Sequence, residues 1–507
     1  MTSDHTSTLP ADGGSERSPL IAPPAGRNES SQASHVPLTQ PKAPKRLGIV
    51  ATCILLIILI ELGAYLATIP LNQVLEENIC DRFHPQRPTH PDDHRCKDKD
   101  VQAELSIIRE WQSTLDFIPG LLTAVPHGFL ADRWGRELVL SLSLVGITLA
   151  SACYILVCAL PDVIPPRVTW LSAVFTFIGG GSAVFNAMVF TIAGDVVSAE
   201  QRSTIFSYLG AAVVGGELLA SPLVYFLMET DLWLAIYIGL GCLVLSTGLS
   251  LMLPETLPRE QRQNAPENVE SPPWHDKIRS ELAQLAQAIS WVIWKDRRVA
   301  LLLFTFLLTT LGRFAQEILL QYVTNRYGWS WSQASLLLSI RAFSNLVLLT
   351  VLIPSASYVL IHKWANSVQG TNLLLARASA ILLIVGVFTI GLSRTSVAMA
   401  VGLGVFALGA GYNFLVRSLL ASVVENDHTG MLYTMMSIFE TVGALVAGPL
   451  LAMSFRTSMG WGGGWLGLPY IAAGVLFAVA TTAVHSISLS VLQPKVVDGE
   501  AEAQQGT

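Results

Sequence analysis

Twelve long apolar stretches constrain the fold of this chain more than any other feature of its sequence. Each is close to the roughly 20 residues that a helix needs to cross the hydrocarbon core of a bilayer. The first six lie at 47–70, 104–128, 137–160, 170–194, 203–228 and 232–253, and the second six at 299–322, 332–352, 373–392, 396–423, 431–455 and 464–484. Because lipid offers no partners to backbone polar groups, we predict an all-α membrane protein with twelve transmembrane helices.

The composition agrees with a lipid-embedded protein and argues against several classes of function. Of 507 residues, 51% are hydrophobic and 13% are charged, which is too apolar for ordinary soluble domains. The formal net charge of −6 leaves no basic surface for nucleic acid. The sequence carries no signature of ATP binding. We therefore expect no enzyme, no cofactor and no metal site.

The spans divide the chain into two six-helix halves with polar segments around them. Residues 1–46 are rich in Ser, Pro, Thr and Gly and are expected to form a disordered tail. In the central linker, apolar residues between Trp274 and Ile293 recur at helical spacing, which predicts an amphipathic helix on the membrane surface or a solvated linker helix. The expected segments are 1–46, 47–253, 254–298, 299–485 and 486–507.

The distribution of positive charge predicts which side of the membrane the two ends occupy. Lys42, Lys45 and Arg46 stand just before the first span. The even-numbered connections carry more Lys and Arg than the odd-numbered ones, apart from the long first outer loop at 71–103. Cytoplasmic loops carry an excess of these residues. We therefore expect both termini in the cytoplasm.

A short internal repeat relates the two halves. Residues 216–223 read GELLASPL in the fifth span, and residues 443–450 read GALVAGPL in the eleventh. Five of the eight positions are identical. Because each copy holds an even number of spans, the two repeats are expected to be parallel, related by an axis along the membrane normal.

Two cysteines, Cys80 and Cys96, lie in the expected outer loop, whereas the other four stand in apolar segments. An oxidising outer compartment permits a disulfide between them. Closing a loop of roughly 17 residues would contribute about 3 kcal/mol. We predict this disulfide, with two free thiols as the alternative.

Residues 128–136 read GFLADRWGR and separate the second and third spans, which predicts a tight, charged turn. This order resembles the signature loop between the second and third helices of the major facilitator superfamily. The resemblance implies that the glycines let helices close and that the charged residues contact neighbouring helix ends at a cytoplasmic gate. The implied gating residues are Gly128, Asp132, Arg133, Gly135 and Arg136. The run PETL at 254–257 is similar to one that commonly ends the sixth helix of this family.

Ionisable residues lie deep in several spans, where each would cost about 2.5 to 3.5 kcal/mol if it faced lipid. We expect them to face a polar cavity. Arg313 and Glu317 are four residues apart and share a helix face, either as a static ion pair or as a switch. Arg417 is expected to brace the gate. The candidate cavity residues are Glu61, Asp116, Glu217, Arg313, Glu317, Arg341 and Glu440.

A proton-coupled carrier needs a buried carboxyl group that can gain and lose a proton. Glu217 and Asp116 have no cation nearby in the sequence, so desolvation favours their protonated form. Glu317 has Arg313 one turn away, which favours its ionised form. We therefore expect Asp116 and Glu217 to be the leading proton sites, with Arg313 and Arg341 as counter-charges. The alternative is that Asp116 and Glu217 are protonated and form hydrogen bonds between helices.

The polar tail, the long outer loop and the run at 111–120 resemble fungal members of the superfamily that export secondary metabolites or xenobiotics. The resemblance implies a monomeric, gradient-driven transporter of a small organic molecule, coupled to protons and working by alternating access. Its membrane would be the plasma membrane or that of an organelle. Phenylalanines and amides suggest a loosely apolar cavity, at Phe175, Phe177, Phe185, Phe304, Phe306, Asn186, Gln316, Asn345 and Asn413.

Two features of the family are absent, and two other functions stay open. No arginine stands four residues before the glycine run 179–181, and the fifth span lacks the GxxxGPxxGG run associated with antiporters. These two absences weaken the prediction that the protein exports its substrate in exchange for protons. Proton-coupled uptake of a nutrient or organic anion is the first alternative, and a non-transporting sensor is the second.

Overall fold

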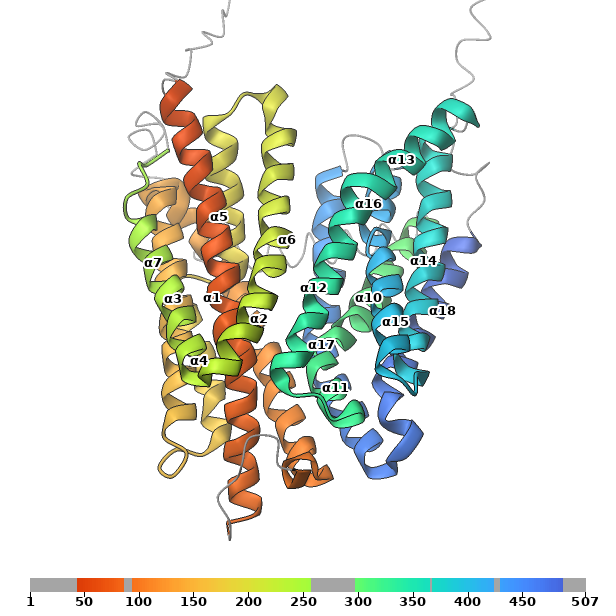
Figure 1. Cartoon of the computed structure of the whole chain (residues 1–507). Helices are drawn as coiled ribbons and strands as arrows, with labels where there is room; N and C mark the ends of the chain where they lie inside the picture. Colours follow the sequence, from red (N-terminus) through yellow and green to blue (C-terminus); the bar gives the residue numbers. More distant parts are fainter. Residues whose placement is uncertain (1–42, 86–93, 257–296, 365–366, 424–428, 487–507) are drawn as a thin grey trace, which may run out of the picture. The chain divides into compact units, whose positions relative to one another are not determined.

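The computed structural model describes residues 43–85, 94–256, 297–364, 367–423 and 429–486. All regular structure in these residues is helical, as the apolar stretches predict. Figure 1 shows the helices of each half gathered into a bundle of their own. The predicted linker helix at 274–293 and the greater part of both predicted tails lie outside the described residues.

The first bundle contains the helices of the N-terminal half. A short 3-10 helix, η1 (His94–Lys97), stands between its first two long helices. The long helices and their interruptions are α1 (Ala43–Phe83), α2 (Lys99–Trp134), α3 (Arg136–Ala159), η2 (Pro166–Leu171), α4 (Ser172–Phe175), η3 (Thr176–Ile178), α5 (Gly181–Val196), α6 (Ala199–Thr230) and α7 (Leu232–Ser250).

The second bundle contains the helices of the C-terminal half. Several of its spans are interrupted by 3-10 or π-helical turns. Its elements are α10 (Arg297–Arg313), η4 (Phe314–Gln316), α11 (Leu319–Tyr327), α12 (Trp331–Val347), η5 (Leu348–Leu352), α13 (Ile353–Tyr358), η6 (Val359–Lys363), α14 (Val368–Leu392), α15 (Ser396–Leu408), α16 (Tyr412–Val423), α17 (Thr429–Trp461), η8 (Gly463–Gly467) and α18 (Leu468–His485).

The twelve predicted spans can all be recognised in the described part of the chain. Ten of its helical stretches are long and apolar enough to cross a membrane, and the pair α10 and α11 forms an eleventh across a 46° bend. The twelfth is α2, which is more polar than the others but has 36 residues. At about 1.5 Å per residue this helix is long enough to cross a bilayer.

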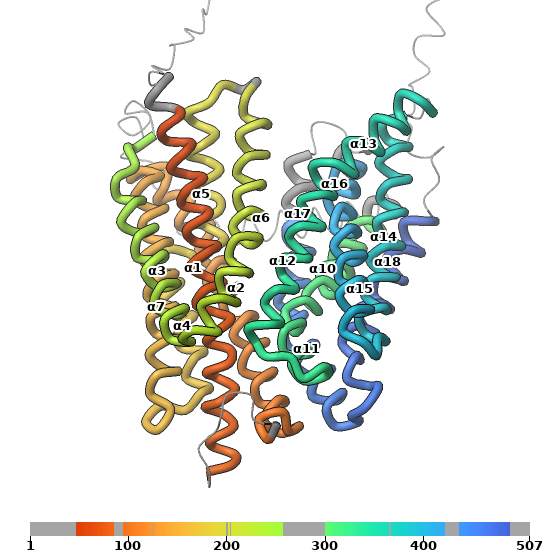
Figure 2. The backbone as a smooth tube through the Cα atoms, in the orientation of Figure 1, coloured from red at the N-terminus to blue at the C-terminus, as the bar shows by residue number. Residues whose placement is uncertain are grey.

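The first expected loop is largely helical, which corrects the boundary drawn at residue 71. In the structure α1 continues to Phe83, past Pro70, so Cys80 lies in a helix (Figure 2). The reason is the spacing of Leu71, Leu75 and Ile79, whose buried side chains recur every four residues and pack into the hydrophobic core. Polar residues between these positions gave this segment the appearance of a loop.

The fourth span is broken where the sequence predicts a continuous helix at 170–194. Gly180 and Gly181 have φ angles of 76° and 63°, in the left-handed region that favours glycine. The chain therefore ends η3 and starts α5 at this glycine pair. The neighbouring Gly179 lies against the backbone of Leu142 and Ser143 on α3, where a side chain has no room.

Candidate functional site

The motif at 128–136 is helical over most of its length, which corrects the predicted turn. In the structure α2 continues to Trp134 and α3 begins at Arg136, so Gly135 alone breaks the helix. Gly135 has a φ angle of 122°, and a Cβ atom there would collide with the carboxylate of Glu255. Asp132 and Arg133 lie exposed on the last turn of α2. We call the end of the protein that carries this motif the motif end.

Two acidic residues that sequence reasoning missed hold the start of α3. Glu255 accepts hydrogen bonds from the backbone N–H groups of Arg136 (3.1 Å) and Glu137 (3.4 Å), so it caps the positive end of this helix. The side chain of Arg136 forms an ion pair with Asp195 on α5. Thr256 donates to the same aspartate at 3.2 Å. The PETL run was the signal that could have led to Glu255.

An ion pair near the middle of the spans joins the two bundles. Arg341 on α12 donates to Oε1 of Glu217 on α6 from Nε at 2.8 Å and from Nη2 at 2.5 Å. It also donates to the hydroxyl of Tyr65 at 3.3 Å. Glu61 lies beside Gly216, within electrostatic range of both members of the pair. Glu217 has no cation nearby in the sequence, but in the folded chain it pairs with Arg341, one of the expected counter-charges, which lies 124 residues further along.

The predicted contact between Arg313 and Glu317 does not form. Helix α10 ends at Arg313 and passes into the 3-10 turn η4, so the two residues no longer share a helix face. Arg313 instead lies within electrostatic range of Glu440, Arg417 and Arg341. Glu440 on α17 forms an ion pair with Arg417 on α16. Arg417 therefore ties two helices of the second bundle together.

Asp116 has a neutral partner. It accepts a hydrogen bond of 2.9 Å from Nε2 of Gln112, one turn earlier on α2. The same amide donates to Ser172 at 3.0 Å. The neighbouring Phe117 meets Phe314 of the second bundle edge to face, with ring centroids 5.7 Å apart. Asp116 thus lies near the place where aromatic side chains of the two bundles touch.

The predicted lining of an apolar cavity is only partly accessible. Phe185 and Phe306 are buried in helix packing, at 2% and 0% exposure, which removes them from any cavity wall. Phe177 and Phe304 are exposed. Gln316 is buried, and neither of its amide atoms has a hydrogen-bond partner among the described residues.

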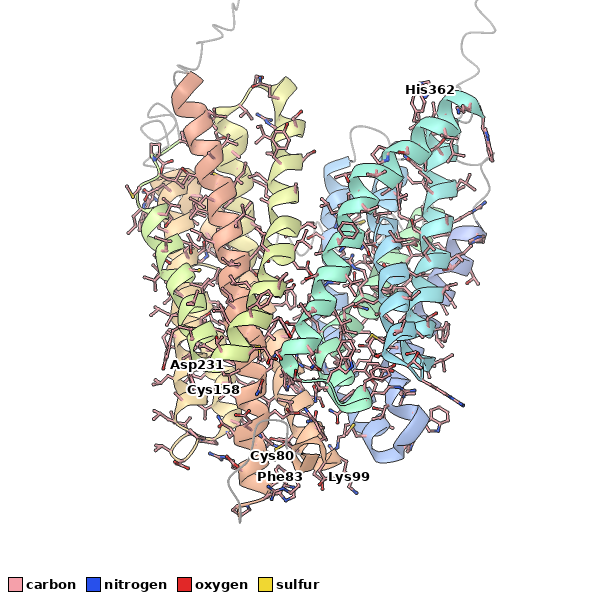
Figure 3. The ribbon with its side chains drawn as sticks, in the orientation of Figure 1. Cys80, Phe83, Lys99, Cys158, Asp231 and His362 are labelled. Atoms are coloured by element: carbon pink, nitrogen blue, oxygen red, sulfur yellow. A yellow bond between two sulfur atoms is a disulfide. The ribbon has the colours of Figure 1, made fainter. Side chains whose placement is uncertain are left out.

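At the opposite end of the protein, Cys80 on α1 and Cys96 on η1 form a disulfide. We call this the disulfide end. Figure 3 shows Cys80, Phe83 and Lys99 close together there. Gln102, in the first turns of α2, donates to the carbonyl oxygen of Cys96 at 2.8 Å. The disulfide and this bond hold the end of α1 beside the start of α2.

Glu76 is the centre of a buried polar cluster at the disulfide end. Lys97 donates to its two carboxylate oxygens at 2.7 and 2.8 Å, and Gln102 donates to it as well. The indole N–H of Trp331, at the start of α12, donates to Oε2 at 2.8 Å. A carboxylate of the first bundle therefore holds a tryptophan of the second.

Further hydrogen bonds join α2 to α11 at this end. Gln321 donates to the backbone and side-chain oxygens of Gln102, both at 2.9 Å. Asn325 donates to the side-chain oxygen of Gln102 at 2.6 Å. Arg109 donates to the carbonyl oxygen of Glu317 at 3.0 Å. Sequence reasoning missed this network because its members lie near the predicted membrane boundary and pair across the two halves.

No group of three or more His, Cys, Asp or Glu side chains in the described residues could hold a metal ion. The ion pairs in this part of the chain include one that joins the two bundles, between Arg341 and Glu217.

Comparison of sequences matches residues 110–448 to the Major Facilitator Superfamily. The MFS efflux pump atnC of Emericella nidulans is 32% identical over 486 residues, covering 94% of this chain and 93% of that protein. The efflux pump ustT of Aspergillus flavus is 29% identical over 460 residues, covering 87% of this chain and 88% of that protein.

Solved structures show the same fold. The D-xylose–proton symporter superposes with a TM-score of 0.59 at 15% identity, covering 86% of this chain and 96% of that one. The human organic anion transporter MFSD10 superposes with a TM-score of 0.55 at 19% identity, covering 87% of this chain and 99% of that one. The family match covers more than half of the chain, and the 32% identical relative aligns over 94% of it. The protein therefore belongs to the major facilitator superfamily and is a multi-pass membrane transporter.

Proposed function

We propose that this transporter exports a small organic molecule, a secondary metabolite or a xenobiotic, by alternating access driven by a proton gradient. The observation that carries the proposal is its alignment, over most of both chains, with relatives named efflux pumps. The proposal places both termini in the cytoplasm, with the motif end inside and the disulfide end outside. It places the protein in the plasma membrane as a monomer, with an organellar membrane as the alternative.

The proposed coupling acts on the ion pair between Arg341 and Glu217. These residues join the two bundles, so the pair has to open or change partner when the bundles move. A proton on Glu217 would remove the charge that holds Arg341. Glu61 is a second carboxyl group within range of that arginine. Asp116, which has a neutral partner, stays a second candidate for the proton.

The proposed substrate is apolar and of medium size. The contact of Phe117 with Phe314 supports this, because it brings aromatic surface of both bundles close to the charged residues. Trp111, the residue before Gln112, adds exposed aromatic surface on α2. An aromatic or polycyclic molecule with one polar group would match both features.

The test uses inside-out membrane vesicles from yeast cells that express the protein. The probes are rhodamine 6G and an extract of fungal metabolites followed by mass spectrometry. We expect at least one compound to accumulate inside when the interior is acidic, and an uncoupler to abolish this accumulation. Vesicles without the protein are the control. Accumulation in right-side-out vesicles with an acidic exterior would instead establish proton-coupled uptake.

A further inference from the structure

Glu110 on α2 is a buried carboxyl group that the proposed coupling does not use. Its side chain is 1% exposed, and its Oε2 atom has no hydrogen-bond partner among the described residues. No ion pair with Glu110 occurs in that part of the chain. A carboxylate buried without a cation or donor is strongly disfavoured, so the group is neutral in this arrangement.

Glu110 lies where α2 of the first bundle packs against α17 of the second. Gly448 on α17 makes this close approach possible. A Cβ atom at Gly448 would collide with the carbonyl oxygen of Glu110 and with the hydroxyl of Thr114. That hydroxyl already donates to the same carbonyl at 3.0 Å. The two bundles thus meet here almost backbone to backbone.

The charged groups around Glu110 do not neutralise it. Those within electrostatic range are Arg109 on the same helix, Glu317 just after η4 and Tyr470 on α18, and α17 contributes none among the described residues. Arg109 directs its guanidinium group to the carbonyl oxygen of Glu317 at 3.0 Å and to Gln321 at 3.4 Å. The one cation in range is therefore engaged elsewhere.

We propose that Glu110 is a proton-binding site that must be loaded before α2 and α17 can close against each other. The inference rests on the proposed alternating access, in which the bundles part at the disulfide end. When they part, Glu110 meets water on the outer side and releases its proton to it as hydronium. Its carboxylate then accepts one proton from hydronium, which leaves water, and the neutral carboxyl group is buried again as the helices close. Closure of this end thereby takes up one proton from the outer side.

The sign of the pH effect follows from linkage. The closed arrangement binds the Glu110 proton more tightly than the open one, so acid favours closure and alkali favours opening. For a single proton, the ratio of open to closed protein changes by at most about tenfold per pH unit. Glu110→Gln keeps the size of the side chain but cannot ionise, so it should keep this end closed across the pH range.

The experiment measures the distance between two spin labels at the disulfide end by pulsed electron resonance in liposomes, with protons as the only ligand. One label replaces exposed Asp162, after α3, and the other replaces exposed Arg394, between α14 and α15. The native free cysteines are first replaced by alanine at Cys53, Cys153, Cys158 and Cys242. We expect the long-distance population to grow as the pH rises, and this growth to disappear in Glu110→Gln.

Two control variants separate a proton site from a general effect. Glu104→Gln removes another carboxyl group of α2, one that is paired with Arg167, and should keep the pH dependence. Glu110→Asp keeps a titrating group and should therefore also keep the pH dependence. An unchanged pH dependence in Glu110→Gln, or none in the unmodified protein, would overturn the inference. The assay needs no substrate, so either result is distinct from failure of the export test.

Discussion

At the scale of single residues, Arg341 is where the charges of the two bundles converge. It holds Glu217 directly, contacts Tyr65, and lies within range of Glu61, Glu317 and Arg313. Arg341 therefore pairs with one carboxylate, and other carboxylates lie nearby. Such a cation can change partners at small cost, because each exchange replaces one charge-assisted contact by another.

Replacing Glu217 by Gln or Asp116 by Asn tests which carboxyl group carries the coupled proton. If either group is the proton site, its variant should lose accumulation driven by a pH gradient but keep substrate exchange at equal pH. The measurement uses reconstituted vesicles and a substrate found by the export test. If both variants still concentrate substrate, neither residue carries the proton.

The ion pair between Arg341 and Glu217 predicts a non-additive effect on stability. Removing one partner of a buried pair costs about 3 to 5 kcal/mol, because the other charge is left unpaired. The double variant Arg341→Gln with Glu217→Gln removes both charges. Its melting temperature in detergent should therefore lie above that of Arg341→Gln alone. Equal melting temperatures for the two proteins would contradict the pairing.

At the scale of elements, the decisive places are helix ends. The junction of α2 and α3 is held at Gly135 by Glu255, and Arg136 is tied to α5 through Asp195. The junction of α1 and α2 is held by a disulfide and by Gln102. Each junction fixes two helices of the first bundle to each other.

The motif end predicts a graded response to loss of charge. Asp132→Asn should shift the balance between states by about 1 to 3 kcal/mol, so transport falls while binding persists. Asp195→Asn should have the larger effect, since it removes the direct partner of Arg136. Both are measured as transport and binding by correctly localised protein. Unchanged transport in Asp132→Asn would contradict a gating role for that residue.

The disulfide end predicts the pattern of thiol labelling. A membrane-impermeant maleimide added from outside should leave Cys80 and Cys96 unmodified until the protein is reduced. A disulfide that closes a loop of this size contributes about 3 kcal/mol, so Cys80→Ala with Cys96→Ala should lower the melting temperature. Labelling of either cysteine without reduction would show that the bond is absent.

At the scale of the whole molecule, two groups of polar contacts join the bundles, beside the close packing of α2 on α17. A central ion pair links α6 to α12, and a hydrogen-bonded network at the disulfide end links α1 and α2 to α11 and α12. Any movement that opens the disulfide end has to break the second set. The strength of this hydrogen-bonded network therefore helps to set how often the disulfide end opens.

Trp331→Phe tests that network. The variant keeps an aromatic ring but loses the N–H group that donates to Glu76. A hydrogen bond to a charged group contributes about 1.5 to 3 kcal/mol, so opening at the disulfide end should become at least about tenfold more frequent. Spin labels at Asp162 and Arg394 report this change. Trp329→Phe, two residues earlier, is the matched control, and the same shift in both variants would contradict the role of the bond.

Hydropathy and charge were enough to place the twelve spans, the motif and the cysteine pair, because these features are local. The ion-pair partner of a buried charged residue is not a local feature of the sequence. Glu217 and Arg341 are 124 residues apart, so only the folded chain shows that they meet. The predicted pair Arg313 and Glu317 failed because α10 ends between them. A helix-face argument holds only where the helix is continuous.

Glu76 and Glu110 were missed for a different reason. Both lie near predicted membrane boundaries, where a charged residue normally meets water and needs no explanation. The extension of α1 to Phe83 and the packing of α17 on α2 bury them instead. Burial of this kind follows from tertiary packing, which neither composition nor hydropathy records.

The length of α1 has a practical consequence for imaging. Its 41 residues span about 61 Å, roughly twice the hydrocarbon thickness of a bilayer. A 54.7 kDa transporter has few landmarks that an electron micrograph can align once detergent surrounds it. A rigid helical module inserted after Phe83 would continue the axis of α1, and the bond between Cys80 and Cys96 would keep it from swivelling. The end of α1 is therefore a suitable place to attach a rigid marker for image alignment.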